Sequence, residues 1–353
     1  MSENDTFRRS VRRHRAVTSR SLLAAVLLGI ALLAPLGMTD YQMFIWAGTI
    51  YVAALAVTWD FFTGLTGYFN FGHLVLVGIA GYTTVLLNSE VGLPLWLTIL
   101  TATLVTGVLG TVILAGPSLR LTGIYFAAIT LIVMIWAENV IILFSDTTGG
   151  LSGYLFITNL GWELSDLLPI GLNSDQMIYY VSVLNLVVIV GLLVLFAKSD
   201  LGKVMLAVRQ DETLLASLGI SPTKFKITGF FIIAVMTGFT GAIWTHSIAL
   251  LSPGTQLNLF LMVDIVIAAV IGGMGTILGP VIGIFILEGI DTALTSIHAS
   301  GILADTIGVD VTEWRRVIWM SIALAFFYFV PEGLYPKLQT LFDGVDEYLE
   351  GRT

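Results

Sequence analysis

The candidate functional residues of this chain are polar side chains within its apolar runs. They are Asn70, Thr130, Glu138, Asn139, His246, Asp264 and Glu288. Such groups are costly in hydrocarbon, so they contact a solute, pair across helices or snorkel to the membrane surface. Most of them lie near the expected ends of apolar runs. Glu138 and Asp264 are therefore the better candidates to line a solute path, with pairing and snorkelling as the alternatives.

A stretch around His73 is rich in glycine. Gly64, Gly67, Gly72 and Gly78 all fall within residues 64-83. Glycine lets helices approach closely and lets a helix break where a cavity hydrates the freed backbone, so the stretch suits either a broken entry or close helix packing. His73 itself is either a titrating gate or substrate contact, or a structural histidine bonded to a neighbouring carbonyl group.

Several kinds of catalytic chemistry are missing from the sequence. It contains no cysteine and only four histidines, so neither a thiolate metal site nor a Ser-His-Asp arrangement can be identified. It also lacks a G-x-x-x-x-G-K-[ST] phosphate loop, and the chain is therefore not itself an ATPase. We predict no catalytic, cofactor-binding or metal-binding residues and no enzyme activity.

The composition places the chain in a lipid bilayer. Hydrophobic residues make up 56% of the 353 positions and charged residues only 11%, which is too little polar surface for a soluble domain. Apolar runs recur along the chain, and each approaches the roughly 20 residues that a helix needs to cross a membrane. The predicted fold class is all-α, a polytopic helical membrane protein.

About ten apolar segments are predicted to enter the membrane. They are residues 21-38, 44-62, 71-88, 94-116, 122-144, 177-197, 227-250, 260-272, 276-290 and 314-330. Segments 260-272 and 276-290 are too short for ordinary upright spans, and they are joined by Gly272-Gly273-Met274-Gly275. Short segments interrupted by glycine indicate half-helices or a tight hairpin near the membrane surface.

The distribution of Lys and Arg predicts the orientation. If the N-terminus is cytoplasmic and all ten segments cross, only Arg315 and Arg316 fall outside the cytoplasmic side. The chain then divides into a basic cytoplasmic tail 1-20, a membrane domain 21-336 with an external loop 145-176, and a cytoplasmic tail 337-353. The N-terminal arginines are interpreted as a topology signal for a retained first span, and no nucleic-acid partner is predicted.

The expected cytoplasmic loop 198-226 is polar and helix-patterned. Asp200 is expected to cap a first helix, and a second short helix opens near Asp211. Gly219 supplies a left-handed C-terminal position, and Ser221-Pro222 starts the next helix. The loop therefore contains two short helices between two membrane segments.

The second short helix is amphipathic. Its apolar side carries Leu214, Leu215 and Leu218. Such a side docks on the chain's own bundle or on the bilayer surface, or it inserts into the groove of a partner subunit and transmits that partner's motion. The pattern by itself leaves these alternatives open.

This loop resembles the coupling loop of ABC importer permeases, specifically those of the LivM-type branched-chain amino acid family. The resemblance is carried by Gly202, Ala207, Arg209, Glu212, Leu218, Gly219 and Ile220. Leu214 and Leu215 stand where that family tends to carry Ala-Ala, a departure that bears on how tightly the helix packs on its ATPase.

Five further motifs extend the resemblance over nearly the whole chain after residue 50. They are GLTGYFNFGHLVLVGIAGYT from Gly64 to Thr83, LRLTGIYFAAITL, TTGGLSG, IGGMGTILGPVIG and PEGLYP. In the first of them Asn70 replaces the usual Ser. A single glycine motif is not specific, but all five occur in the family's order and spacing.

The resemblance implies a permease subunit of an ATP-driven importer in the cytoplasmic (inner) membrane. It implies as partners a second, LivH-type permease subunit, two ATP-binding subunits and an external solute-binding protein. The residues expected to couple to the ATPase are Gly202, Arg209, Asp211, Glu212, Leu215, Leu218, Gly219 and Ile220. Those expected on the translocation path are Gly67, Asn70, His73, Thr130, Glu138 and Asp264.

Three other functions are compatible with the sequence. Urea or amide permeases share these motifs, and a single sequence does not separate them from permeases for branched-chain amino acids. A secondary transporter or channel would need no ATPase, and a membrane scaffold would transport nothing.

Overall fold

The computed structural model describes residues 28–118, 120–121, 123–155, 157–168, 171–299, 311–329 and 333–337. The predicted tail 1-20, the start of the first segment and all but the first residue of the predicted tail 337-353 lie outside this set.

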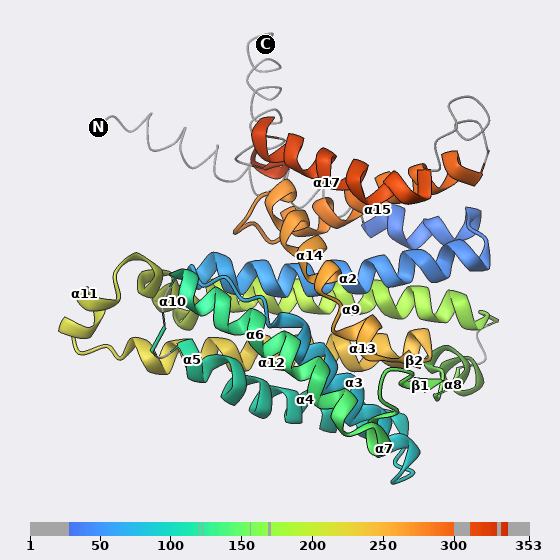
Figure 1. Ribbon diagram of the computed structural model, residues 1–353, viewed down its shortest axis with the longest axis horizontal. Coiled ribbons are helices and arrows are strands. Elements are labelled where there is room, and N and C mark those ends of the chain that lie inside the picture. The colour runs from blue at the N-terminus through green and yellow to red at the C-terminus, as the bar shows by residue number, and fades with distance from the viewer. Residues whose placement is uncertain are drawn as a thin grey trace, which may run out of the picture.

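Long helices lie roughly side by side along one direction (Figure 1). Among the described residues, six stretches are long and apolar enough to cross a membrane. They are α2 (Asp40–Thr66), α4 (Leu95–Gly110) with the π-helical turn η2 (Thr111–Ala115), α6 (Gly123–Leu143), α9 (Ser174–Lys198), α12 (Pro222–Ile248), and α13 (Pro253–Gln256) followed by α14 (Leu259–Gly272).

The described residues also form further elements, most of them shorter. Apolar ones are Leu28–Gly37, which ends in the 3-10 turn η1 (Ala34–Gly37), α3 (His73–Ser89), and Val317–Phe326 within α17 (Val311–Phe329). The others are α5 (Gly116–Ser118), α7 (Ser145–Thr148), α8 (Leu160–Leu167), α10 (Asp200–Gln210), α11 (Glu212–Ser217) and α15 (Gly279–Ala299). Two-residue strands β1 (Tyr154–Leu155) and β2 (Leu250–Leu251) pair antiparallel. The predicted all-α class is confirmed apart from this small ladder.

The hairpin segments are longer than the sequence indicated. The helix expected to end at residue 290 is α15, which runs for 21 residues to Ala299. The apolar run stops before Asp291, but helical hydrogen bonds are made by the backbone and continue past polar side chains. The expected end at residue 290 was therefore wrong, although α15 is not among the six stretches that are long and apolar enough to cross a membrane. The expectation that 260-272 is too short was also wrong, because Pro253–Gly272 is one of those six. The number of ten membrane segments stays a prediction.

α2 is the central helix of the bundle. It packs against α9, α12, α14 and α15, and Tyr51, Leu55 and Trp59 are almost fully buried. A helix that is apolar on all sides belongs in the interior, because burial of each large side chain contributes about 1.5–3 kcal/mol. These four helices therefore surround α2, whereas α4 packs on α3 and α12.

The helical structure is interrupted between α2 and α3, and this interruption is called the break below. Residues 67–72 are not helical, yet His73 at the start of α3 lies beside Thr58, with 3.2 Å between His73 Nε2 and Thr58 Oγ1. Thr58 lies eight residues before the end of α2, about 12 Å along the helix axis. The segment therefore turns back into the bundle, as expected for a broken entry.

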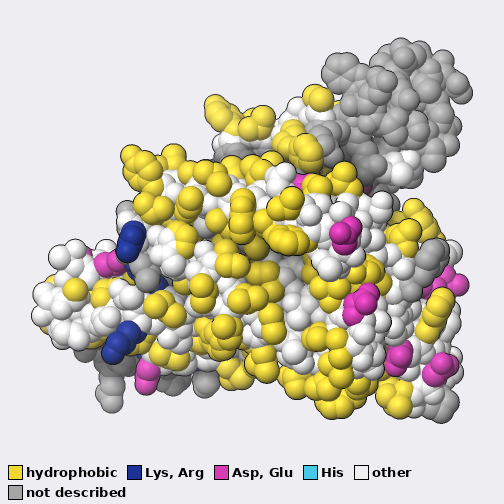
Figure 2. All heavy atoms as spheres, turned by 60° about the horizontal axis from the view of Figure 1, so that its bottom comes forward, with side chains coloured by type: hydrophobic (Ala, Val, Ile, Leu, Met, Phe, Trp, Pro, Cys, Tyr) yellow, Lys and Arg dark blue, Asp and Glu magenta, His cyan; other side chains and the backbone are white. Residues whose placement is uncertain are grey.

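The two ends of the bundle differ. α10 and α11 lie at one end, and β1, β2 and α8 lie at the opposite end (Figure 1). On the face shown in Figure 2, Lys and Arg side chains gather at the α11 end and most Asp and Glu side chains at the other, with hydrophobic side chains between them. This asymmetry is the pattern that a membrane protein shows across its two sides.

The turn between α14 and α15 contacts α2 through glycine. A Cβ added to Gly64 would lie 2.8 Å from the Cα of Gly275, so the two backbones touch with no room for a side chain. Gly275 has a φ of +76° and Gly273 one of +118°, conformations that favour glycine.

Gly64→Ala should therefore destabilise the protein, by about 1–3 kcal/mol, because backbone would have to yield to the new methyl group. Gly48→Ala on the same helix is the matched control, since no atom lies within 4 Å of its added Cβ. Thermal unfolding of both variants in detergent tests this. Equal unfolding temperatures would contradict the contact.

Candidate functional site

Helices α10 and α11 form the polar loop that the sequence singled out. Ser199 caps α10, with its hydroxyl accepting a hydrogen bond from the Gly202 N–H at 3.2 Å. The expected cap, Asp200, is instead the first helical residue, so that prediction was off by one position. Gly202 packs too tightly for any side chain, because an added Cβ would lie 2.5 Å from the carbonyl oxygen of Phe196.

α11 begins and ends where the sequence indicated. Its cap is Asp211, whose Oδ1 accepts the N–H groups of Thr213 at 2.9 Å and Leu214 at 3.0 Å. At the other end Gly219 has a φ of +79°, and the Ile220 N–H returns to the Leu215 carbonyl oxygen at 3.1 Å. α12 then starts at Pro222 with Ser221 as its cap.

The three leucines of α11 do not share one environment. Leu215 is 8% exposed and packs within the chain, whereas Leu214 is 58% exposed and Leu218 is 68% exposed. Burial of Leu215 fastens α11 to its own bundle. The helix therefore keeps two leucine side chains outside at the end of the molecule, where they are available to another surface.

The first residue of α11 belongs to a partly buried ionic cluster. The Lys226 ammonium contacts both carboxylate oxygens of Glu212, Oε1 at 2.6 Å and Oε2 at 2.7 Å. It also donates to the Tyr68 hydroxyl at 2.7 Å, and that hydroxyl donates to Glu212 Oε1 at 2.9 Å. Burial raises the pKa of the Tyr68 phenol, which keeps its proton and acts as this donor.

Arg209 reaches the end of α2 from α10. Its guanidinium donates to the carbonyl oxygen of Gly64, and its Cγ lies 3.5 Å from the position of a Cβ on Gly67. Gly67 has a φ of +76°, so a side chain there would be strained as well. Arg209 and Glu212 were both expected to act in ATPase coupling. They hold the loop against the C-terminal end of α2 and the break that follows it.

Asp60 of α2 contacts the turn between α14 and α15. It is 1% exposed, and its carboxylate oxygens accept the Gly275 N–H at 2.9 Å and 3.0 Å. Successive turn N–H groups form a cradle for an anion. The sequence analysis missed Asp60, Tyr68 and Lys226. A lone carboxylate inside the apolar run 44-62 was the signal for Asp60.

Four of the predicted path residues lie together at the break after α2. Asn70 Oδ1 accepts the Gly72 N–H at 2.9 Å, and Thr130 Oγ1 accepts the Phe71 N–H at 3.1 Å. Asn70, His73 and Thr130 are at most 3% exposed. In this conformation they satisfy backbone and neighbouring hydroxyl groups, and they do not face an open channel.

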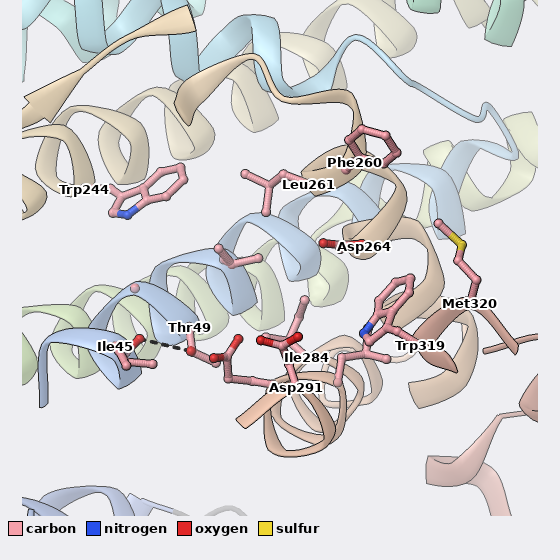
Figure 3. Close-up of a pocket in the computed structure, with 14 residues that line it drawn as sticks. Ile45, Thr49, Trp244, Phe260, Leu261, Asp264, Ile284, Asp291, Trp319 and Met320 are labelled. Carbon is pink, nitrogen blue, oxygen red and sulfur yellow. Dashed lines mark hydrogen bonds between the residues drawn. The ribbon is translucent and has the colours of Figure 1, made fainter. Parts of the chain in front are cut away.

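The other two predicted path residues lie elsewhere. Glu138 is about two turns farther along α6 than Thr130. Asp264 on α14 lines a pocket of about 640 Å³ that also receives Glu288 and Asp291 from α15. Figure 3 shows Asp264 and Asp291 near Trp319 of α17, with Thr49 of α2 across from them. The pocket is thus walled by aromatic rings and half-buried carboxylates.

Within the described residues no group of three His, Cys, Asp or Glu side chains is placed to hold a metal ion.

A family comparison matches most of the chain. Residues 41–328 match the family described as branched-chain amino acid transport system / permease component. No solved structure matches.

Two curated proteins are similar to the chain along most of its length. A high-affinity branched-chain amino acid transport system permease protein LivM from Salmonella typhimurium is 27% identical over 91% of this chain and 76% of its own length. The LivM protein of Escherichia coli is 28% identical over 82% of this chain and 70% of its own length.

The ionic cluster predicts unequal effects of removing its two charges. The Lys226 side chain is 7% exposed and that of Glu212 is 37% exposed. Glu212→Gln leaves the buried Lys226 ammonium without a charged partner. Lys226→Met leaves the Glu212 carboxylate unpaired, but water still reaches it. We expect Glu212→Gln to cost about 2–4 kcal/mol of unfolding free energy and Lys226→Met clearly less.

Thermal unfolding in detergent measures the difference. The matched control is Asp200→Asn, which removes the exposed carboxylate of the Asp200–Lys203 pair and should leave the unfolding temperature unchanged. A larger loss with Lys226→Met than with Glu212→Gln would contradict this account of the cluster.

Proposed function

Since the chain belongs to the branched-chain amino acid transport permease family, we propose that it is the membrane-spanning subunit of an ATP-driven ABC importer. It would carry branched-chain amino acids, or similarly small polar solutes, into the cell. The chain is a multi-pass transport subunit and not an enzyme, so ATP would be hydrolysed by separate ATP-binding subunits.

One observation supports this proposal above the others. α11 is fastened to the bundle by Leu215 and Glu212, yet it presents Leu214 and Leu218 to the outside. A short amphipathic helix with outward anchors fits the groove of a partner, because such anchors bury their apolar surface on binding. We assign the docking role to Leu214 and Leu218, and the holding of α11 to the remaining coupling residues.

The partners and the topology belong to the same proposal. The assembly would contain a second, LivH-type permease subunit, two ATP-binding subunits and an external solute-binding protein. The α11 end would face the cytoplasm together with both termini, and ten segments would enter the membrane. The gathering of Lys and Arg at the α11 end supports this orientation.

The solute path would run along the broken entry at 67–72. Gly67, Asn70, His73 and Thr130 lie at or beside this break, and the nearly complete burial of Asn70, His73 and Thr130 suits a closed conformation that opens when the ATPase changes state. Asp264 and Glu138 would contribute from α14 and α6.

Uptake assays test the transport function. The chain is co-expressed with the products of neighbouring transport genes, purified as a complex and placed in proteoliposomes with ATP inside. We expect ATP-dependent uptake of labelled leucine. Uptake of urea in its place would shift the cargo to amides, and leucine uptake by the chain alone without ATP would refute the ABC importer.

Docking variants test the role of α11. Replacing both exposed leucines, Leu214→Ser with Leu218→Ser, should weaken association with the ATP-binding subunits about 10-fold or more, because buried apolar anchors dominate such interfaces. Leu151→Ser is the matched control, since Leu151 is 69% exposed near the other end of the bundle. Binding is measured by titrating the purified ATP-binding subunits. Unchanged affinity in the double variant would remove α11 from the interface.

A further inference from the structure

Lys226 is a buried cation that the transport proposal leaves without a role. It lies at the start of α12, its side chain is 7% exposed, and its ammonium is 4.7 Å from the centre of the Tyr68 ring. Its polar partners are Glu212 and the Tyr68 hydroxyl. An ion pair with one buried partner contributes little net stability, because desolvation of the buried charge offsets the attraction. The pair therefore calls for a reason other than stability.

The cluster joins segments that are far apart in the sequence. Glu212 is the first residue of α11, Tyr68 lies in the break between α2 and α3, and Lys226 belongs to α12. The Tyr68 ring also packs edge-on against Phe126 of α6, with ring centroids 5.2 Å apart. Displacement of α11 therefore acts directly on the break, on α12 and through Tyr68 on α6.

The contacts fix the orientation of α11 as well as its position. Lys226 grips both carboxylate oxygens of Glu212, and the Tyr68 hydroxyl both accepts from Lys226 and donates to Glu212. Hydrogen bonds to charged groups are directional and strong. A hydrophobic contact such as that of Leu215 permits sliding, whereas this ring of four contacts among three side chains does not.

We propose that Lys226 and Tyr68 are positioning residues that clamp Glu212 and so deliver the motion of α11 to the α2–α3 break and to α12. The inference rests on the proposed function, because it presumes that an ATPase moves α11. It assigns the transmission of that motion to three side chains of this chain. We call the contacts of Lys226 and Tyr68 with Glu212 the clamp. Without the clamp the ATPase should still bind and hydrolyse ATP, but less solute should be transported for each ATP hydrolysed.

The test compares two readouts in the assembled importer. ATP hydrolysis and leucine uptake are measured in the same proteoliposomes, and their ratio is the ATP consumed per leucine. We expect Lys226→Met and Tyr68→Phe to raise this ratio on the order of tenfold, as befits the loss of a coupling contact. Tyr68→Phe is the milder change, since it keeps the ring and removes only the hydroxyl group.

Two further variants separate transmission from structure. Lys224→Met is the matched control, because Lys224 is an exposed lysine two positions away on α12, and its ratio should equal that of the wild type. The charge exchange Lys226→Glu with Glu212→Lys should bring the ratio back toward the wild-type value, since the Tyr68 hydroxyl then donates to Glu at 226 and accepts from Lys at 212. A merely structural role would change the amount of assembled complex and leave the ratio constant.

The outcomes are distinguishable from failure of the proposed function. If the wild type itself shows no ATP-driven uptake, the importer proposal fails and the clamp fails with it. If the wild type transports and Tyr68→Phe hydrolyses ATP at the wild-type ratio, the clamp alone is refuted. If Lys226→Met does not assemble, Tyr68→Phe and the charge exchange still decide the question.

Discussion

The break between α2 and α3 is possible only because its backbone groups find partners inside the protein. Non-helical backbone is tolerated at membrane depth only where protein or a water-filled cavity satisfies it. Trp59 Nε1 donates to the Asn70 carbonyl oxygen at 2.7 Å, Thr63 Oγ1 donates to the Tyr68 carbonyl oxygen at 3.2 Å, and Thr130 Oγ1 accepts from Phe71. Polar side chains of α2 and α6 thus replace the hydrogen bonds that a continuous helix would make.

Charged and polar residues from several elements therefore meet at the C-terminal end of α2. The helix ends in contact with Arg209 from α10, its break presents Tyr68 to Glu212 of α11, and Asp60 holds the turn between α14 and α15. One buried helix therefore connects the loop that carries α10 and α11 to both the α2–α3 break and the α14–α15 turn. A transporter that changes access from side to side needs such rigid connections between its outer loop and its interior.

The sequence was informative where the signal is local. The cap at Asp211 and the left-handed Gly219 follow from preferences of single residues, and both are present in the structure. The sequence was less informative at α15, where an apolar run underestimates a helix that continues through Glu288 and Asp291. It gave no indication that Leu215 turns inward while Leu214 and Leu218 turn outward, since an apolar stripe does not identify its partner.

Composition and apolar periodicity by themselves determined an all-α membrane protein and the position of its amphipathic loop helix, because both depend on local patterns. The family was indicated by the resemblance of its ordered motifs. Only the tertiary structure decided that Lys226 meets Glu212 and that Asp60 meets Gly275, residues separated in the chain by as many as 215 positions. No local preference encodes such contacts. They arise when burial of α2 brings distant segments together and places these charged and polar groups beside one another.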